Sequence, residues 1–230
     1  MTVKNRAVII AGGEINDDLA LSFIQEDSYI IAADRGLDFL ARHDILPDLV
    51  VGDFDSAPEE TAKRFLEANP GIEVRAYNWE KDYTDLEIAA VAAADRGFEQ
   101  IDILGATGTR IDHMIGALQT LALLLDRGCR GCVIDPCNRI TMHDGNFSIR
   151  KDSQWGQYVS LFAWGGPAEG ITLRGFHFPM ENGTITTSGT LAISNQIEAD
   201  EAEVCFKRGR LLMVESADRP WQESRTDQKD

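Results

Sequence analysis

The stretch Leu49 to Ser56, Leu-Val-Val-Gly-Asp-Phe-Asp-Ser, places two aspartates directly after a short apolar run. The run predicts a buried strand over Leu49 to Val51 that ends at Gly52. In extended backbone, side chains at positions i and i+2 project to the same side, so Asp53 and Asp55 are expected to point together. Two carboxylates about 6 to 7 Å apart repel by about 2 to 3 kcal/mol at an effective dielectric near 20. A divalent cation removes this repulsion, and oxygen ligands of this kind suit Mg²⁺.

A structural role accounts for the same stretch about equally well. Asp53 would then cap a turn, and Ser56 would cap a helix that has Pro58 in its first turn. The stretch alone leaves both interpretations open, so the rest of the chain has to decide between them.

Up to about residue 140 the chain alternates short apolar runs with helical patterns. Strands are predicted over residues 6–11, 29–33, 49–51, 72–76, 101–104 and 131–134, and helices over residues 17–24, 37–42, 59–68, 85–96 and 111–127. This alternation predicts an α/β domain with a largely parallel, Rossmann-like sheet that is covered by helices on both faces. The ligand crevice of such a sheet lies outside the carboxyl ends of its strands.

Beyond residue 140 the apolar residues come in short runs separated by Gly, Pro, Asn and Asp. Strands are predicted over residues 158–164, 171–178, 191–193, 202–206 and 211–214. This pattern is typical of an antiparallel β-sandwich or barrel. We therefore predict an α/β domain over residues 1–140, a β-domain over residues 141–216 and a polar tail over residues 217–230.

Composition excludes several classes of protein. The formal net charge of −16 argues against a nucleic-acid surface, which needs clustered Lys and Arg. The sequence contains neither an apolar stretch of membrane-spanning length nor a signal-peptide pattern, so we expect a cytoplasmic protein that does not bind membranes. Cys129 and Cys132 form a C-x-x-C pair, and Cys137 follows shortly after. A zinc site would need a fourth ligand at matching spacing, which is missing, so reduced structural thiols are favoured.

A second candidate stretch lies between the strand at residues 72–76 and the helix that follows it. Thr84 and Glu87 have the spacing of a capping box, which explains these two residues structurally. The capping box leaves Lys81, Asp82 and Asp85 unexplained. We expect Lys81 to meet a phosphate and Asp85 to join the predicted metal site.

The third stretch, residues 105–113, contains two glycines and opens the helix at residues 111–127. A glycine loop at a helix start can present backbone N–H groups to an anion, although such loops also serve as simple tight turns. Arg110 offers a planar cationic fork suited to phosphoryl oxygens. Asp112 and His113 enter the first helical turn, where favourable dipole placement is the structural interpretation of Asp112 and packing or capping that of His113. For His113 taken alone, the structural interpretation is favoured.

Six acids thus collect at the carboxyl edge of one predicted sheet: Asp34, Asp53, Asp55, Asp82, Asp85 and Asp112. Carboxylates that hold Mg²⁺ beside Lys81 and Arg110 suit phosphoryl chemistry, in which the protein positions groups and neutralises charge. The sequence has neither a Walker A loop nor a kinase-type glycine loop. The residues alone therefore predict a Mg²⁺-dependent phosphoryl-transfer or phosphohydrolase enzyme.

Taken together, these stretches resemble the thiamine pyrophosphokinase (thiamine diphosphokinase) family. The matching residues are 33–36, 47–56, 81–87 and 105–113 in the first half, and 170–175, 178–179 and 188–195 in the second. They cover nearly the whole chain in the expected order. Arg35 is a departure, because the family often has glycine at this position.

The resemblance implies an N-terminal α/β nucleotide domain, a C-terminal β-sandwich, and a homodimer whose active sites are shared between subunits. It also implies that ATP donates its β,γ-diphosphoryl group to the hydroxyethyl oxygen of thiamine, which releases AMP. Thiamine and ATP would then be the small-molecule partners, and Mg²⁺ the cofactor.

The resemblance also assigns roles to individual residues. The Mg²⁺ ligands would be Asp53, Asp55 and Asp85, which together with Arg110 and Asp112 form the catalytic set. ATP and its phosphates would be bound by Asp34, Lys81, Asp82, Thr84, Thr107, Gly108, Arg110 and His113. Thiamine would contact Ser194 and Asn195, although a β-turn explains this pair as well.

Two other functions stay open beside this one. The acids alone fit a Mg²⁺-dependent nucleotide phosphohydrolase that uses water as the nucleophile, and a non-catalytic thiamine- or nucleotide-binding sensor would bind without turnover. The sequence does not identify the aspartate that acts as general base. It also leaves open which aromatic residue stacks on thiamine, with Trp155, Trp164 and Trp221 as candidates.

Overall fold

The computed structural model describes residues 6–52, 60–76 and 83–220 of the 230-residue chain. The chain divides into two compact units, residues 1–135 and 136–230, which are described separately below. The division falls close to residue 140, where the sequence pattern changes. Among the described residues, no helix is long and apolar enough to cross a membrane.

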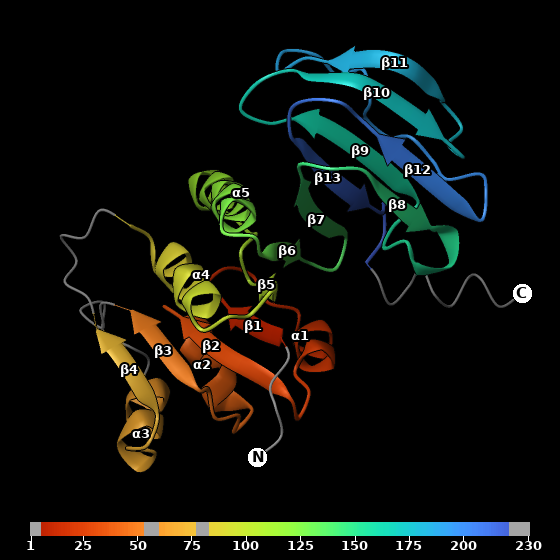
Figure 1. The fold of residues 1–230 in the computed structure, drawn as a ribbon. Helices are drawn as coiled ribbons and strands as arrows, with labels where there is room; N and C mark the ends of the chain where they lie inside the picture. Colours follow the sequence, from red (N-terminus) through yellow and green to blue (C-terminus); the bar gives the residue numbers. More distant parts are fainter. Residues whose placement is uncertain (1–5, 53–59, 77–82, 221–230) are drawn as a thin grey trace, which may run out of the picture. The chain divides into compact units, whose positions relative to one another are not determined.

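The first unit contains a six-stranded parallel sheet (Figure 1). Its strands are β1 (Arg6–Ile10), β2 (Ser28–Ala33), β3 (Leu49–Gly52), β4 (Glu73–Ala76), β5 (Gln100–Leu104) and β6 (Arg130–Ile134). Its helices are α1 (Asp17–Phe23), α2 (Gly36–Arg42), α3 (Glu60–Ala68), α4 (Asp85–Asp95) and α5 (Ile111–Asp126). Every predicted strand and helix of this half is confirmed to within one residue at each end.

The strand order explains both the sequence pattern and the place of the ligand crevice. Parallel pairing gives the order β4-β3-β2-β1-β5-β6. Figure 1 shows α4 and α5 on one side of this sheet and α2 and α3 on the other. Central strand residues such as Ile9, Ile31 and Ile103 are fully buried, as expected for strands covered on both faces. The order reverses between β1 and β5, where α/β sheets of this kind bind ligands.

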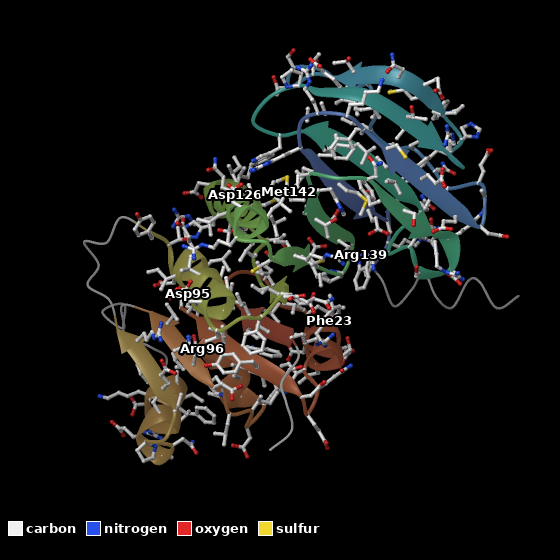
Figure 2. The ribbon with its side chains drawn as sticks, in the orientation of Figure 1. Phe23, Asp95, Arg96, Asp126, Arg139 and Met142 are labelled. Carbon is white, nitrogen blue, oxygen red and sulfur yellow. The ribbon has the colours of Figure 1, made fainter. Side chains whose placement is uncertain are left out.

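Arg96, labelled in Figure 2, ties the end of α4 to the sheet. Its guanidinium donates to both carboxylate oxygens of Glu73 on β4, at 2.7 and 2.8 Å. It also lies 5.5 Å from the centre of the Tyr29 ring on β2. These hydrogen bonds from Arg96 lower the pKa of Glu73, so the carboxylate is ionised at neutral pH. The network fixes the edge strand β4, which immediately precedes residues 77–82.

The second unit consists of antiparallel strands in two sheets. The strands are β7 (Asn138–His143), β8 (Phe147–Arg150), β9 (Tyr158–Ala163), β10 (Ala168–Arg174), β11 (Met180–Ile185), β12 (Glu201–Cys205) and β13 (Leu211–Ser216), with a short 3₁₀ helix η1 (Lys151–Ser153). One sheet has the order β7-β13-β9 and the other β11-β10-β12-β8. Leu161 and Met213 of the first sheet share one buried cluster with Ile171 and Val204 of the second. This shared core confirms the predicted antiparallel β-sandwich.

The second unit also differs from the sequence prediction in several elements. The strand predicted over residues 191–193 is wrong, because this segment is a loop in which Ala192 is buried while Leu191 is 69% exposed. Strands β7, β8 and β11 were not predicted. β8 and β11 form the two edges of their sheet, so they carry few apolar residues and give a weak hydrophobic pattern.

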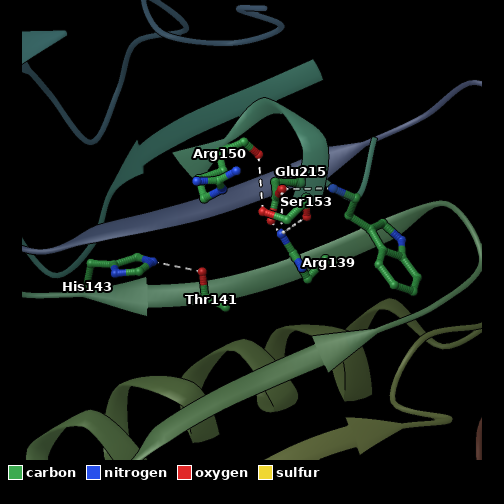
Figure 3. Close-up of polar contacts among 7 residues, drawn as sticks. Arg139, Thr141, His143, Arg150, Ser153 and Glu215 are labelled. Atoms are coloured by element: carbon green, nitrogen blue, oxygen red, sulfur yellow. Dashed lines mark hydrogen bonds and ion pairs between the residues drawn. The ribbon is translucent and has the colours of Figure 1, made fainter. Parts of the chain in front are cut away.

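A buried carboxylate anchors the other sheet of this unit (Figure 3). Glu215 of β13 is 0% exposed, and its oxygens accept hydrogen bonds from Nε and Nη2 of Arg139 on β7, at 2.5 and 2.8 Å. The backbone N–H of Trp155 donates to the same carboxylate at 2.9 Å, while Arg139 donates to the carbonyl of Ser153 at 3.1 Å. The pair thereby fixes the connection between η1 and β9 to strands β7 and β13.

Candidate active site

A pocket of about 590 Å³ opens at the carboxyl ends of β1, β2 and β5. Its lining comprises residues 11–14 after β1, 33–35 after β2, 83–86 at the start of α4, 105–110 after β5, and His113 and Ala117 of α5. The pocket therefore lies at the point where the strand order reverses. This is the position predicted from the sequence for a ligand crevice.

Two glycine-containing loops interlock at this pocket. The N–H of Gly13 donates to the carbonyl of Gly105 at 2.7 Å, and the N–H of Glu14 donates to the carbonyl of Thr107 at 2.9 Å. A Cβ on Gly13 would lie 2.4 Å from the Thr107 oxygen and 2.5 Å from the Gly105 oxygen. Only glycine allows the two loops to approach this closely, so Gly13 and Gly105 hold a rigid border of the pocket.

The same hydrogen bonds change what the loops can offer to an anion. The N–H groups of Gly13 and Glu14 are engaged in holding the loops together. At the start of α5, Arg110 is the N-cap residue and makes no side-chain capping hydrogen bond, so its side chain does not cap the N–H groups of the first helical turn.

Asp34 follows β2 in a left-handed conformation, with φ of 53°. The tight turn is enforced by Gly36, because a Cβ there would lie only 1.9 Å from the carbonyl oxygen of Ile10. The Asp34 side chain is exposed, and its Oδ2 lies 2.9 Å from the point where Gly12 would carry a Cβ. The turn thus places a carboxylate directly over the first glycine of the β1 loop.

The start of α4 contributes a capped helix end to the pocket. The backbone N–H of Glu87 donates to Oγ1 of Thr84 at 3.2 Å, which confirms Thr84 as the N-cap residue. Asp85 lies in the first turn of α4 and lines the pocket. The cap therefore fixes the backbone that carries the Asp85 carboxylate.

Arg110 and Asp112 form an ion pair at the start of α5. Nε and Nη2 of Arg110 donate to the two oxygens of Asp112 at 3.1 and 2.5 Å, and both side chains are about two-thirds exposed. The hydrogen bonds from Arg110 lower the pKa of Asp112 to about 2. Asp112 is consequently a carboxylate at neutral pH. The guanidinium of Arg110, which the sequence predicts to bind phosphate, is directed at this carboxylate.

The pocket brings together most of the described residues that the sequence predicts for ATP binding and catalysis. Its lining includes Asp34, Thr84, Asp85, Thr107, Gly108, Arg110 and His113. Asp112 is connected to it through the ion pair with Arg110. Asp53, Asp55, Lys81 and Asp82 lie outside the described residues, in the segments that follow β3 and β4.

The lining residues that were not predicted as site residues include Gly12, Gly13, Glu14 and Tyr83. The glycine pair had a visible signal, because it follows a buried strand and precedes a helix. Tyr83 is 61% exposed, and its position between Asp82 and Thr84 could also have drawn attention to it. Glu14 gives no sequence signal, since its place depends on the contact between the two loops.

The residues predicted for thiamine lie in a loop of the second unit. Ser194 is exposed with φ of 57°, and its N–H donates to Oγ of Ser160 at 2.9 Å. Asn195 is buried, and its Oδ1 accepts from the N–H groups of Phe178 and Gln196 at 3.0 and 2.9 Å. Its Nδ2 donates to the carbonyl of Phe178 at 2.8 Å. Asn195 therefore holds the loop in shape, while Ser194 lies at its surface.

The donor chemistry available for a metal is consistent with Mg²⁺. Within the described part of the chain no group of three His, Cys, Asp or Glu residues could hold a metal ion. Asp85 supplies a carboxylate at the pocket, and the predicted ligands Asp53 and Asp55 follow β3 outside the described residues. Three carboxylates are hard oxygen donors of the type that Mg²⁺ prefers.

This fold and pocket correspond to enzymes that transfer phosphoryl groups, because that reaction requires a protein to position groups and to neutralise charge. Comparison with known proteins identifies the family within this class. Residues 20–133 match the family model for the catalytic domain of thiamin pyrophosphokinase. Residues 146–211 match the model for its vitamin B1 binding domain.

A curated relative agrees with these matches. Thiamine pyrophosphokinase from Bacillus subtilis (strain 168) is 35% identical over 213 residues, which cover 91% of this chain and 98% of the relative. The chain belongs to the thiamine pyrophosphokinase family and is an enzyme, as the resemblance predicted.

Solved structures agree with this membership. The crystal structure of the Bacillus subtilis thiamine pyrophosphokinase superposes with a TM-score of 0.84 at 33% identity, covering 93% of this chain and 99% of that one. The enzyme from Geobacillus thermodenitrificans gives 0.82 at 32% identity, with coverage of 93% and 98%. Yeast thiamin pyrophosphokinase, at 15% identity and a TM-score of 0.74, shares the fold.

Proposed function

We propose that this chain transfers the β,γ-diphosphoryl group of ATP to the hydroxyethyl oxygen of thiamine and releases AMP. The observation that carries the proposal is the pocket at the reversal of strand order, where interlocked glycine loops meet Arg110 and the carboxylates of Asp34 and Asp85. In a chain of this family, such a pocket suits a nucleotide whose phosphates approach the start of α5.

The proposed roles follow from charge and position. Arg110 and Lys81 contact the phosphates, and Arg110 has the fork geometry that grips two oxygens at once. Asp53, Asp55 and Asp85 would hold Mg²⁺, which when bound neutralises charge on the phosphates. The chain's own task is then to align the leaving AMP oxygen, the transferred group and the thiamine hydroxyl.

The Arg110–Asp112 pair bears on which carboxylate accepts the proton of the thiamine hydroxyl. A general base works best when its pKa lies near the operating pH. The pKa of Asp112 is lowered to about 2 by the hydrogen bonds from Arg110, so this carboxylate is a weak proton acceptor. We assign Asp112 to holding Arg110 in place until a phosphate binds, and we propose that one of the other carboxylates at the pocket accepts the proton of the thiamine hydroxyl.

Thiamine carries a positive charge on its thiazolium ring, which the net charge of −16 attracts. We propose that Ser194 contacts thiamine, and that Asn195 acts by keeping this loop in shape. The proposal includes the homodimer with shared active sites and a cytoplasmic location, both of which the family resemblance implies.

A single incubation tests the proposed reaction. The protein is mixed with ATP and Mg²⁺, with or without thiamine, and AMP and thiamine diphosphate are quantified by chromatography. We expect equal amounts of the two products, formed only when thiamine is present. AMP or ADP formed at the same rate without thiamine would indicate a phosphohydrolase, and binding of both ligands without any product would indicate a sensor.

Replacing Arg110 by lysine keeps the charge but removes the planar fork. We expect kcat to fall by about 10- to 100-fold with little change in the KM for thiamine, because two-point contacts strengthen as charge develops in the transition state. Steady-state kinetics with both substrates measures this. Arg150→Lys is the matched control, because Arg150 forms the same type of pair with Asp152 in the second unit, at 3.1 and 2.6 Å. A change confined to the KM for thiamine would place Arg110 elsewhere.

Sharing of the active site is tested in heterodimers of differently tagged chains. One chain carries Asp55→Asn, and the other carries Ser194→Gly, which suits the positive φ of this residue and removes its hydroxyl. If sites are shared, one site of each heterodimer collects both changes and the other collects neither, so the KM for thiamine should equal that of the wild type. If each chain forms its own site, the remaining activity should show the raised KM of the Ser194→Gly homodimer.

A further inference from the structure

We infer that Asp34 recognises the ribose of the nucleotide, accepting hydrogen bonds from its 2′- and 3′-hydroxyl groups, and thereby selects ribonucleotides over deoxyribonucleotides. This inference rests on the proposed function, because it places ATP in the pocket described above. It assigns Asp34 to substrate specificity, whereas the family resemblance placed this residue in the ATP- and phosphate-binding set without a specific contact.

The sheet order supports this position for the ribose. Asp34 follows β2 and Arg110 follows β5, and these strands flank β1 on opposite sides. Neighbouring strands are about 4.8 Å apart, so the starting points of the two loops are separated by about two strand spacings, or roughly 10 Å. The glycine loop at residues 11–14 lies between them. A nucleotide whose transferred phosphates meet Arg110 can therefore cross this loop and bring its ribose to Asp34.

The backbone of Asp34 is fixed on both sides. Its N–H donates to the carbonyl of Val51 at 2.9 Å, and its carbonyl accepts from the N–H of Leu37 at 3.3 Å. Gly36 packs against the Ile10 carbonyl, which leaves the turn little room to relax. The conformation with φ of 53° favours glycine, yet the chain carries an exposed aspartate there. Left-handed residues other than glycine cluster at functional sites, where the surrounding structure holds the unfavourable conformation.

The chemistry of a carboxylate also favours the ribose. An ionised carboxylate has two oxygens that only accept hydrogen bonds, and a vicinal diol offers two O–H donors. A carboxylate that faced the phosphates directly would be repelled by them. The absence of a side chain at Gly12 lets the Asp34 carboxylate lie against the loop after β1, because a Cβ there would be 2.9 Å from its Oδ2. Dinucleotide-binding sheets use an acid after the second strand in the same way.

The test compares ATP with 2′-deoxyATP as diphosphoryl donors to thiamine, in the wild type and in the Asp34→Gly and Asp34→Asn variants. Both replacements tolerate the left-handed backbone. The wild type should prefer ATP in kcat/KM by about 10- to 100-fold, the value expected for hydrogen bonds to a charged group. Asp34→Gly should reduce this preference to within about threefold, because activity with ATP loses both hydrogen bonds whereas activity with 2′-deoxyATP loses only the bond from its 3′-hydroxyl. Asp34→Asn, which keeps one acceptor oxygen, should give an intermediate preference.

Asp44→Gly is the matched control, because Asp44 has φ of 54° and is exposed between α2 and β3, away from the pocket lining. This variant should keep the wild-type preference. The inference is overturned if the wild type uses both nucleotides equally, or if Asp34→Gly retains the full preference. A higher Mg²⁺ requirement with an unchanged preference would also overturn it and make Asp34 a metal ligand.

Failure of the proposed function gives a different result. In that case the wild type would form no AMP in a thiamine-dependent manner with either nucleotide. Calorimetric titration of the same variants with ATP and 2′-deoxyATP then tests the inference without turnover. Tighter binding of ATP to the wild type that disappears in Asp34→Gly supports ribose recognition, and equal affinities in both proteins refute it.

Discussion

Replacing Gly13 by alanine is expected to lower kcat/KM for ATP by about 100-fold or more. The new methyl group would lie 2.4 and 2.5 Å from two backbone oxygens, those of Thr107 and Gly105. Neither oxygen can rotate away as a side chain would, so the loops have to separate by roughly 1 Å. Displacement of a positioning group by about 1 Å can cost about 100-fold in rate. The same overpacking should lower the free energy of unfolding by about 1 to 3 kcal/mol.

Steady-state kinetics and denaturant unfolding of the purified variant measure both effects. Gly71→Ala is the control, because a Cβ at Gly71 meets no atom within 4 Å and this glycine lies in an exposed turn before β4. It should behave as the wild type does. Nearly normal kinetics in Gly13→Ala would show that the pocket tolerates separation of the loops, and that their interlock does not position the nucleotide.

Replacing Arg139 by methionine is expected to give the largest loss of stability among the ion pairs described. Glu215 is fully buried, and removal of its partner leaves a buried carboxylate with only the N–H of Trp155 among the hydrogen bonds described above. Arg139 is itself 30% exposed, and the cost arises at Glu215, because leaving a buried charge without its partner typically costs about 3 kcal/mol or more. Methionine retains the apolar stem, so the effect reports the lost charge rather than a cavity.

Chemical denaturation followed by circular dichroism measures this loss. Arg150→Met is the control for removing a surface arginine from the same unit, because the Arg150–Asp152 pair is about two-thirds exposed on both sides. Exposed pairs contribute little, so this variant should unfold close to the wild-type midpoint. If the two variants are equally stable, water entering the space left by Arg139 must solvate Glu215 adequately.

The first unit could be predicted in detail because local and global signals agree there. Its strands are buried on both faces and therefore read as continuous apolar runs, such as the one before Asp53. A capping residue, Thr84, marks the start of α4. In a parallel sheet all carboxyl ends lie at one edge, so placing the elements was enough to bring Asp34, Asp85 and Arg110 to the same pocket.

Features that depend on long-range contacts could not be predicted. The role of Gly13 depends on its meeting Gly105, which is distant in the sequence, and Glu14 enters the pocket through the same contact. Asn195 was predicted to bind thiamine, and the hydrogen bonds of its amide to Phe178 became visible only in the folded loop. The edge strands of the second unit were not predicted because many of their side chains face solvent and are polar, which leaves a weak hydrophobic pattern.

The pair between Arg110 and Asp112 has a consequence for the ionic-strength dependence of nucleotide binding. If Arg110 binds a phosphate as proposed, the phosphate displaces the Asp112 carboxylate rather than loosely held solvent ions, so one anion is exchanged for another. The number of ion pairs made by this arginine then stays constant during binding. Added salt screens the pair in the empty pocket and the contact in the filled pocket alike, which makes the contribution of Arg110 to affinity less sensitive to salt than that of an isolated arginine.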